Sequence, residues 1–307
     1  MTGIANTIEC RLLCASSCAY GIDHNGDYIP VSPYCEGVGW LDSDPPMVIY
    51  GGDAKINACL VGVNQDDGII VAFRGTLMPI PITRSSITDW WQSIIDSEPR
   101  TEPNVPGKVH DGFANALDTI WTKIIDQVNV LKALYPAKKV YMTGHSKGGP
   151  MATISAARMH FDATIDIQPA AVYTFASPHP GNQEFVDNFP LATIPVIRYE
   201  NRLDIVPLVP PTEAAIDLAE NVPGLRKLFK LARGWDYASL GERRYITKKH
   251  EVINNAPELT KTQFAKLAFT VMAGPCGLKK VGMAHMYMCG FGYMLGTCPS
   301  GVCPDSD

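Results

Sequence analysis

Apolar residues along the chain recur with two different spacings. Over residues 111–135 they return every three or four positions, which is the spacing of one buried face of an α-helix. Two shorter apolar runs, 58–63 and 69–73, flank the polar, glycine-containing segment 64–68, a pattern typical of a β-hairpin. The sequence therefore predicts a helix over 111–135 and an antiparallel pair of strands before it.

Further short apolar runs alternate with helix-compatible segments in the second half of the chain. They span residues 138–142, 170–175 and 194–199. Alternating strands and helices with apolar strands indicate an α/β fold, in which helices cover both faces of a mostly parallel central sheet.

The rest of the chain is less regular. Residues 1–24 favour a helix, whereas 25–55 are rich in Gly, Pro and Asp and predict irregular structure. Residues 211–240 interrupt the alternation and are interpreted as an insertion that carries a basic helical piece, and 241–246 are predicted to form an edge strand. Because no linker or repeat divides the chain, we expect residues 1–307 to form a single domain.

One turn in the predicted sheet carries a recognisable chemical pattern. Residues 144–148 read Gly-His-Ser-Lys-Gly, which fits the G-x-S-x-G nucleophile elbow between a strand and a helix. Glycines two positions before and after the serine would let the strand and the helix approach closely. The pattern predicts Ser146 as a nucleophile, exposed at a sharp turn.

A serine nucleophile needs an acid and a base, which follow it in this chain order in such folds. Asp204 is the best acid, because it lies just after a predicted strand and before a proline-rich loop. Of the two histidines that follow it, His250 sits in a charged stretch typical of a solvated surface. His285 is flanked by small and apolar residues, and we predict it to be the base.

Three further positions complete the predicted site. The backbone N–H of Lys147 and the residue Thr76, which follows a strand in Arg-Gly-Thr, are expected to bind the oxyanion. His145 precedes the nucleophile and should point away from it; we group it with the residues around the substrate.

The segment after Thr76 is apolar where a polar loop would be expected. Residues 77–88 are a candidate lid over the site, and their apolar side chains would contact substrate or lipid. These side chains are Leu77, Met78, Ile80 and Ile82. The sequence does not decide whether this segment or the insertion at 211–240 covers the site.

Composition narrows the classes of function. The net charge of −5 gives no reason to expect nucleic-acid binding, and no apolar run reaches the ~18 residues that a membrane span needs. The first twenty residues do not resemble a signal peptide, so the compartment stays open: secreted if a signal was removed upstream, otherwise cytoplasmic.

The chain has nine cysteines. Cys10, Cys14 and Cys18 recur every four residues, so they lie roughly on one helical face. Their spacing matches no trusted metal motif, and no metal is predicted. We interpret them as buried free thiols; the alternative is a disulfide link to the C-terminal group Cys289, Cys298 and Cys303.

Taken together, these motifs resemble the class 3 lipases, the family that includes the fungal triacylglycerol lipases. The matching stretches follow the family's order over roughly residues 55–290, and they are 71–76, 88–90, 109–113, 143–149, 174–178 with 181–182, 201–207 and 284–287. The resemblance implies an α/β-hydrolase fold in which Ser146, Asp204 and His285 form the triad. It also implies Thr76 and Lys147 as oxyanion donors, with a lid after Thr76. Lys147 departs from the family, which usually has an apolar residue there.

The sequence therefore predicts a serine carboxylic ester hydrolase that needs no cofactor. A lipase acting on acylglycerol esters at a lipid–water interface is the first expectation, and a short-chain or phenolic-acid (feruloyl-type) esterase is the alternative. A non-catalytic binding module on the same fold is the alternative of a different class, since fold does not fix function.

Overall fold

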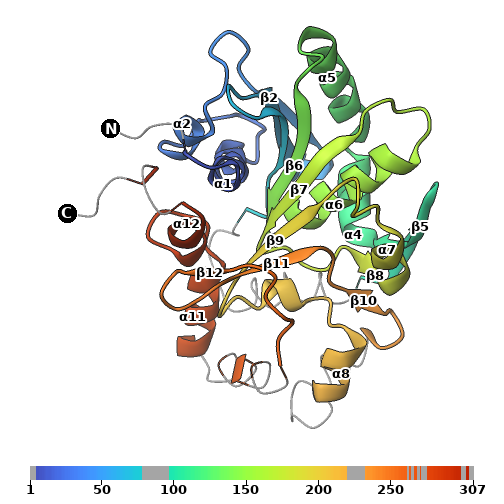
Figure 1. The fold of residues 1–307 in the computed structure, drawn as a ribbon, viewed down its shortest axis with the longest axis vertical. Helices are drawn as coiled ribbons and strands as arrows, with labels where there is room; N and C mark the ends of the chain where they lie inside the picture. The colour runs from blue at the N-terminus through green and yellow to red at the C-terminus, as the bar shows by residue number, and fades with distance from the viewer. Residues whose placement is uncertain are drawn as a thin grey trace.

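The computed structural model describes residues 5–77, 97–219, 232–260, 263, 266–267, 270, 275–298 and 302–303. Its described residues form an eight-stranded sheet at the centre of the molecule (Figure 1). In spatial order the strands are β1 (Met47–Gly51), β2 (Asn57–Val63), β3 (Gly68–Phe73), β6 (Lys139–His145), β7 (Pro169–Phe175), β9 (Val196–Asn201), β11 (Glu242–Ile246) and β12 (Val252–Ile253). The five strands from β3 to β11 are parallel, and antiparallel pairs close both edges. The mostly parallel sheet and the β2–β3 hairpin are as predicted.

Helices cover both faces of this sheet, as expected. The helices α4 (Asp111–Asp118), α5 (Trp121–Leu134) and α6 (Gly148–Phe161) lie on one face, and α1 (Ile8–Cys18) and α12 (Gly292–Thr297) lie on the other (Figure 1). The strand side chains alternate between these layers: in β3, Val71 and Phe73 pack with the first group, and Ile70 and Ala72 with the second. Two apolar cores therefore fill the space on either side of one sheet.

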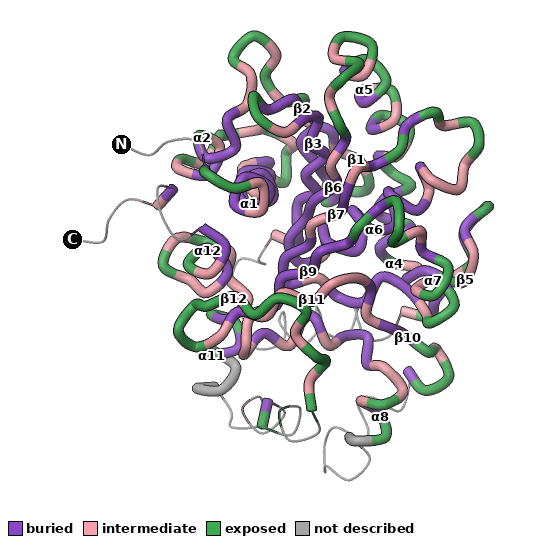
Figure 2. Tube along the Cα trace, viewed as in Figure 1, coloured by how far each residue is buried: buried purple, intermediate pink, exposed green. Residues whose placement is uncertain are grey.

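Helix α1 is the most enclosed helix of the second layer. Its residues from Cys10 to Cys18 are all buried (Figure 2). It packs against β6 on one side and against α12 and the short helix α2 (Tyr34–Val38) on the others. The N-terminal region is thus part of the core that supports the central strands.

The predicted helix over 111–135 is two helices, α4 and α5, which are separated at Thr119 and Ile120. Ile120 has a non-helical backbone and is buried, and the Thr119 hydroxyl donates to the carbonyl of Ala116 at 2.7 Å. The carbonyl of Thr119 lies so close to Gly51 of β1 that a Cβ at Gly51 would overlap it. A kink of this kind keeps the same apolar face, so periodicity alone does not show it.

Other sequence expectations need correction. β11 is not an edge strand, because β12 pairs on its outer side. Residues 25–55 contain α2 and β1 and are not wholly irregular. A second, four-stranded sheet was not predicted, and its short strands are β10 (Tyr237–Ala238), β8 (Gly181–Asn182), β5 (Val105–His110) and β4 (Pro99–Glu102).

The remaining helices lie mostly in the second half of the chain. They are α7 (Gln183–Asn188), α8 (Glu213–Ala219) and α11 (Pro275–His285). Within the 211–240 insertion, α8 and β10 are described, whereas most of the predicted basic helical piece lies outside the described residues. None of the helices in the described part of the chain is long and apolar enough to cross a membrane.

The cysteine interpretation was wrong for two of the three residues of α1. Cys10 is bonded to Cys298 and Cys18 to Cys35, while Cys14 is a buried thiol as predicted. The helical spacing placed the three on one face, but the partner of Cys10 directly follows α12 and the partner of Cys18 lies in α2, and both helices pack against α1 only in the folded chain. The alternative of a link between the two ends of the chain is confirmed by Cys10–Cys298.

Two more features concern other cysteines that the structure describes. Cys289 is bonded to Cys303, and Cys59 is a buried thiol. Among the described residues, the sulfur atoms of Cys10, Cys14 and Cys298 are the one group close enough to hold a metal ion, and a disulfide already joins two of them.

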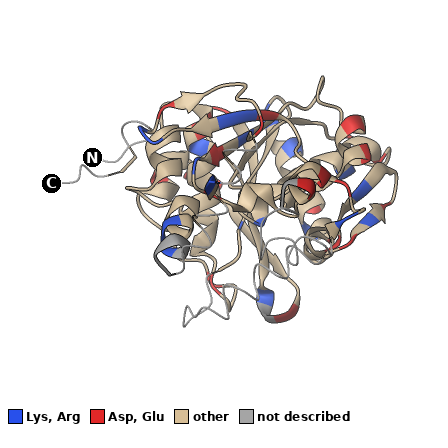
Figure 3. Cartoon of the chain, turned by 90° about the horizontal axis from the view of Figure 1, so that it is seen from below, with Lys and Arg blue, Asp and Glu red and all other residues tan. Residues whose placement is uncertain are grey.

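Charged residues are interspersed over the chain in the view of Figure 3, without separation into acidic and basic faces. One network joins Arg100 and Arg158 to Glu102 and Asp118 on the side of α4 and α6. Glu102 is buried between the two guanidinium groups, so this network ties the second sheet to the helices of the first layer.

Candidate active site

The elbow is built as the glycine spacing predicts. β6 ends at His145 and α6 begins at Gly148, and Ser146 between them has a φ of 55°. A positive φ is strained for a residue with a side chain and is found where the surrounding structure enforces it. A Cβ at Gly144 would overlap the carbonyl of Gly148, and a Cβ at Gly148 would overlap the carbonyl of Phe73. Both glycines are therefore required for strand and helix to meet at this turn.

The structure brings the three predicted triad side chains together across 139 residues of sequence. Nε2 of His285 lies 3.0 Å from Oγ of Ser146, and Nδ1 of His285 lies 2.9 Å from Oδ2 of Asp204. Asp204 lies just beyond the end of β9, and His285 is the last residue of α11. A carboxylate oxygen accepts hydrogen bonds, so Nδ1 of His285 donates to Asp204 and Nε2 can accept from the serine hydroxyl.

The acid is held by groups that the sequence did not point to. The hydroxyl of Tyr293 donates to Oδ2 of Asp204 at 2.7 Å, and the N–H of Val206 donates to Oδ1 at 2.9 Å. Tyr293 is fully buried in α12, and burial together with the nearby carboxylate raises its pKa well above the ordinary value. A tyrosine in a glycine-rich C-terminal stretch carries no sequence signal for this contact.

Both ring nitrogens of His145, which we grouped with the substrate residues, contact groups of the protein itself. The ring is buried: its Nε2–H donates to the backbone carbonyl of His285 at 2.8 Å, and its Nδ1 accepts from the Tyr20 hydroxyl at 2.8 Å. Burial lowers the pKa of His145 well below the ordinary value, which keeps the ring neutral. The ring thus supports the backbone that carries His285.

The predicted oxyanion loop is anchored by the arginine that precedes it. Arg74 is buried, and its guanidinium donates to four backbone carbonyls from two other loops, those of Ile22, Asp23, Lys55 and Ile56. Gly75 lies so close to the hydroxyl of Tyr20 that no side chain would fit. These contacts fix the path of the chain into Thr76, which is partly buried.

Lys147 is the N-cap residue of α6. Its backbone N–H is therefore at the helix N-terminus, where N–H groups have no intrahelical acceptor and are available to an anion. Its side chain is not extended into solvent; it reaches Asn57 at the start of β2.

Only the first residue of the predicted lid is visible. Leu77 is partly buried next to Thr76. Met78, Ile80, Ile82 and the rest of the 77–88 segment lie outside the described residues.

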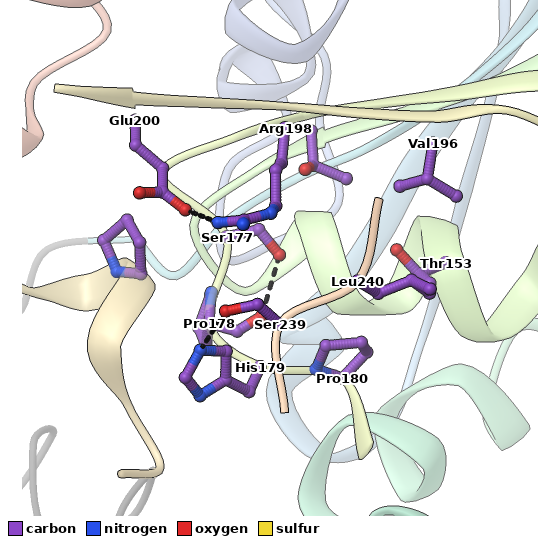
Figure 4. Close-up of a pocket in the computed structure, with 12 residues that line it drawn as sticks. Thr153, Ser177, Pro178, His179, Pro180, Val196, Arg198, Glu200, Ser239 and Leu240 are labelled. Carbon is purple, nitrogen blue, oxygen red and sulfur yellow. Dashed lines mark hydrogen bonds and ion pairs between the residues drawn. The ribbon is translucent and has the colours of Figure 1, made fainter. Parts of the chain in front are cut away.

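A small cavity lies beside β9 (Figure 4). His179 donates from Nδ1 to the carbonyl of Pro210 at 2.7 Å and contacts Ser239 through Nε2 at 3.1 Å, while Arg198 pairs with Glu200. Its volume of about 20 Å³ suits one water molecule. It is too small for an ester substrate.

Comparison with known proteins gives the same family as the motifs. Residues 70–214 match the model of the family described as lipase (class 3). The chain is 30% identical over 157 residues to the lipase of Rhizomucor miehei, which covers 50% of this chain and 41% of that protein. It is 28% identical over 174 residues to the secreted mono- and diacylglycerol lipase 1 of Fusarium solani, covering 56% and 49%. The match therefore spans less than half the length of these curated relatives.

Solved structures extend the likeness to most of the chain. The structure of the Rhizomucor miehei triacylglyceride lipase superposes with a TM-score of 0.56 at 21% identity, over 81% of this chain and 83% of that one. At this identity the likeness shows the fold. The chain has the α/β-hydrolase fold, and its residues 70–214 match the model of the class 3 lipase family.

Proposed function

We propose that this protein is a serine carboxylic ester hydrolase that cleaves acylglycerol esters through an acyl-enzyme. The observation that carries the proposal is the continuous hydrogen-bonded series from Ser146 through His285 to Asp204. A serine on a strained turn, a base within hydrogen-bond reach of it and a buried carboxylate behind the base are the parts that nucleophilic ester hydrolysis needs.

In the first half-reaction His285 takes the proton of Ser146 at Nε2 while Oγ attacks the ester carbonyl carbon. Asp204 keeps the imidazole in the required tautomer and stabilises the imidazolium. His285 then gives its proton to the departing alcohol, which leaves the acyl group on Ser146. In the second half-reaction His285 takes a proton from a water molecule, whose oxygen attacks the acyl carbon. The proton then passes from His285 to Oγ of Ser146, and the carboxylic acid product leaves.

The negative charge on the carbonyl oxygen is bound by the backbone N–H of Lys147 and by Thr76. Donors fixed before the reaction starts stabilise the developing charge most effectively. The contacts of Arg74 and Gly75 support this role for Thr76, because they set its position independently of the substrate.

Acylglycerols are the proposed substrate class because of the family and the relatives' own names, which are those of lipases. We further propose a single domain over residues 1–307 with segment 77–88 as a lid that opens at a lipid–water interface. The three disulfides among the described residues suit an oxidising compartment, which favours secretion.

Labelling with a fluorophosphonate tests the nucleophile. Ser146 should become covalently modified, and Ser146→Ala should abolish both labelling and turnover, with a loss on the order of 10³-fold or more. His285→Ala should lose nearly as much, whereas His250→Ala, which changes an exposed histidine outside the site, should remain active. A protein whose Ser146 is not labelled, or a fully active His285→Ala, would overturn the proposal.

Substrate class needs a separate measurement. A chain-length series of p-nitrophenyl esters, with a triglyceride emulsion alongside, should show hydrolysis of the long-chain emulsion. If only the shortest-chain or the phenolic esters are hydrolysed, the protein is an esterase and the proposed lipase activity is wrong.

A further inference from the structure

The side chain of Lys147 occupies an unusual position for a lysine. It follows the nucleophile directly, is largely covered by the fold and donates from Nζ to Oδ1 of Asn57. Lysine ammonium groups ordinarily stay in water, since burying an isolated charge is costly. A lysine drawn inward beside the reacting serine therefore calls for an explanation.

The orientation of Asn57 is fixed by its other contact. Nδ2 of Asn57 donates to the Thr119 hydroxyl at 3.1 Å, and that hydroxyl already donates to the carbonyl of Ala116 at 2.7 Å. Thr119 can therefore only accept from Asn57, which leaves Oδ1 as the atom that faces Lys147. Asn57 is itself buried, so this acceptor is built into the fold.

This contact spans the root of the oxyanion loop. The N–H of Arg74 donates to the carbonyl of Ala58, so the chain leaves β3 beside the first residues of β2. Lys147 lies on the elbow and Asn57 on β2, and their hydrogen bond joins these two elements next to residues 74–76. The bond therefore ties the elbow, which supplies one proposed oxyanion donor, to the strand beside which the other donor's loop begins.

The charge of Lys147 is not neutralised by a carboxylate. In the part of the chain that the structure describes, no Asp or Glu forms an ion pair with it. Arg74, at the end of β3, is the charged group that lowers the pKa of Lys147. Asp23 and Tyr20, from the N-terminal region, in turn raise the pKa of Arg74. His285 contacts the neighbouring Ser146 through Nε2. Burial, with a contribution from Arg74, lowers the pKa of Lys147 to about 8.

We propose that the protonated side chain of Lys147, held by Asn57, positions the oxyanion donors and adds positive charge beside them, so that turnover requires the ammonium form. The inference rests on the proposed function and adds a residue that acts through its neighbours. The required ammonium is present below the pKa of Lys147 and is lost as pH rises through about 8. Turnover should accordingly decline on the alkaline side while the fold persists.

The test is the pH dependence of kcat on dissolved p-nitrophenyl butyrate, for the whole protein and three variants. Lys147→Met keeps the backbone N–H and the aliphatic part of the side chain. Its kcat should be roughly tenfold lower with little change in KM, and it should no longer decline at alkaline pH. Asn57→Asp places a carboxylate against the ammonium and should shift the midpoint of the decline upward by about one pH unit. Lys139→Met, an exposed lysine on β6, is the control and should match the unaltered protein.

The outcomes separate clearly. Lys147→Met with unaltered kcat and an unaltered alkaline decline would overturn the inference. Circular dichroism at each pH shows whether that variant folds. If it does not fold, Asn57→Asp is the deciding variant, and an unchanged midpoint of its alkaline decline in kcat overturns the inference. Failure of the proposed function is a different result, because then the unaltered protein itself would show neither ester turnover nor fluorophosphonate labelling of Ser146.

Discussion

Tyr293 and His285 share one oxygen atom of Asp204. Oδ2 accepts from the Tyr293 hydroxyl at 2.7 Å and faces Nδ1 of His285 at 2.9 Å. The same hydroxyl accepts from the N–H of Asn201 at 3.1 Å, so Tyr293 is held from both sides. The short C-terminal helix α12 therefore fixes the rotamer of Asp204, which in turn orients His285.

Removing this hydroxyl should weaken catalysis without unfolding the protein. Tyr293→Phe leaves the ring in its buried place but takes away one charge-assisted hydrogen bond, which is worth about 1.5–3 kcal/mol. We expect kcat to fall roughly tenfold with KM little changed. Tyr141→Phe, which alters a half-buried tyrosine on β6, is the matched control. Equal, negligible effects of the two variants on kcat would contradict a role for Tyr293 in holding Asp204.

Tyr20 should support the base through His145. Tyr20→Phe preserves the stacking on Tyr287, where the ring centroids lie 4.2 Å apart, and removes only the hydrogen bond to Nδ1 of His145. The carbonyl of His285 would then be held by a less constrained ring. We expect a loss of kcat of roughly threefold to tenfold, since a small displacement of a catalytic group is costly. A change confined to the melting temperature would show instead that Tyr20 contributes only to packing.

The disulfide between Cys10 and Cys298 should contribute most to stability. It closes a loop of 288 residues, compared with 14 for Cys289–Cys303. In the chain-entropy model a longer loop gives a larger constraint on the unfolded chain, and losing it should cost roughly 2–5 kcal/mol. The pair Cys10→Ser with Cys298→Ser should lower the melting temperature by several degrees more than Cys289→Ser with Cys303→Ser. The reverse order would contradict this expectation.

The same change should also reach the active site. Cys298 directly follows α12, which carries Tyr293. Releasing it from α1 should lower kcat at temperatures where circular dichroism still shows the folded protein. Full specific activity of the folded variant would mean that packing alone holds α12 in place.

The apolar segment after Thr76 should matter for emulsions more than for dissolved esters. Its prolines restrict the backbone, so we expect residues 77–88 to move as a unit and to expose Ile80 and Ile82 to lipid. Changing both to serine should reduce hydrolysis of a triglyceride emulsion far more than hydrolysis of p-nitrophenyl butyrate. Equal losses of activity on the two substrates would mean that the segment only lines the substrate pocket. No loss on either substrate would mean that the insertion at 211–240 covers the site instead.

The sequence by itself determined the features that depend on local spacing. Alternating apolar runs fix the strands, and the glycines around Ser146 fix a turn that no larger residue would permit. The candidates Asp204 and His285 were also selected from local context, because each lies in a segment suited to the end of a strand or to a lined loop.

Only the tertiary structure decided which distant groups meet. Tyr293 reaches Asp204, Tyr20 reaches His145, and Cys10 reaches Cys298 because α1 and α12 pack side by side on one face of the sheet. Spacing along the chain describes the face of one helix, and it holds no information about which other helix covers that face. The inward turn of the Lys147 side chain was hidden for the same reason: its partner Asn57 lies 90 residues away and becomes a neighbour only once β2, β3 and β6 have joined the sheet.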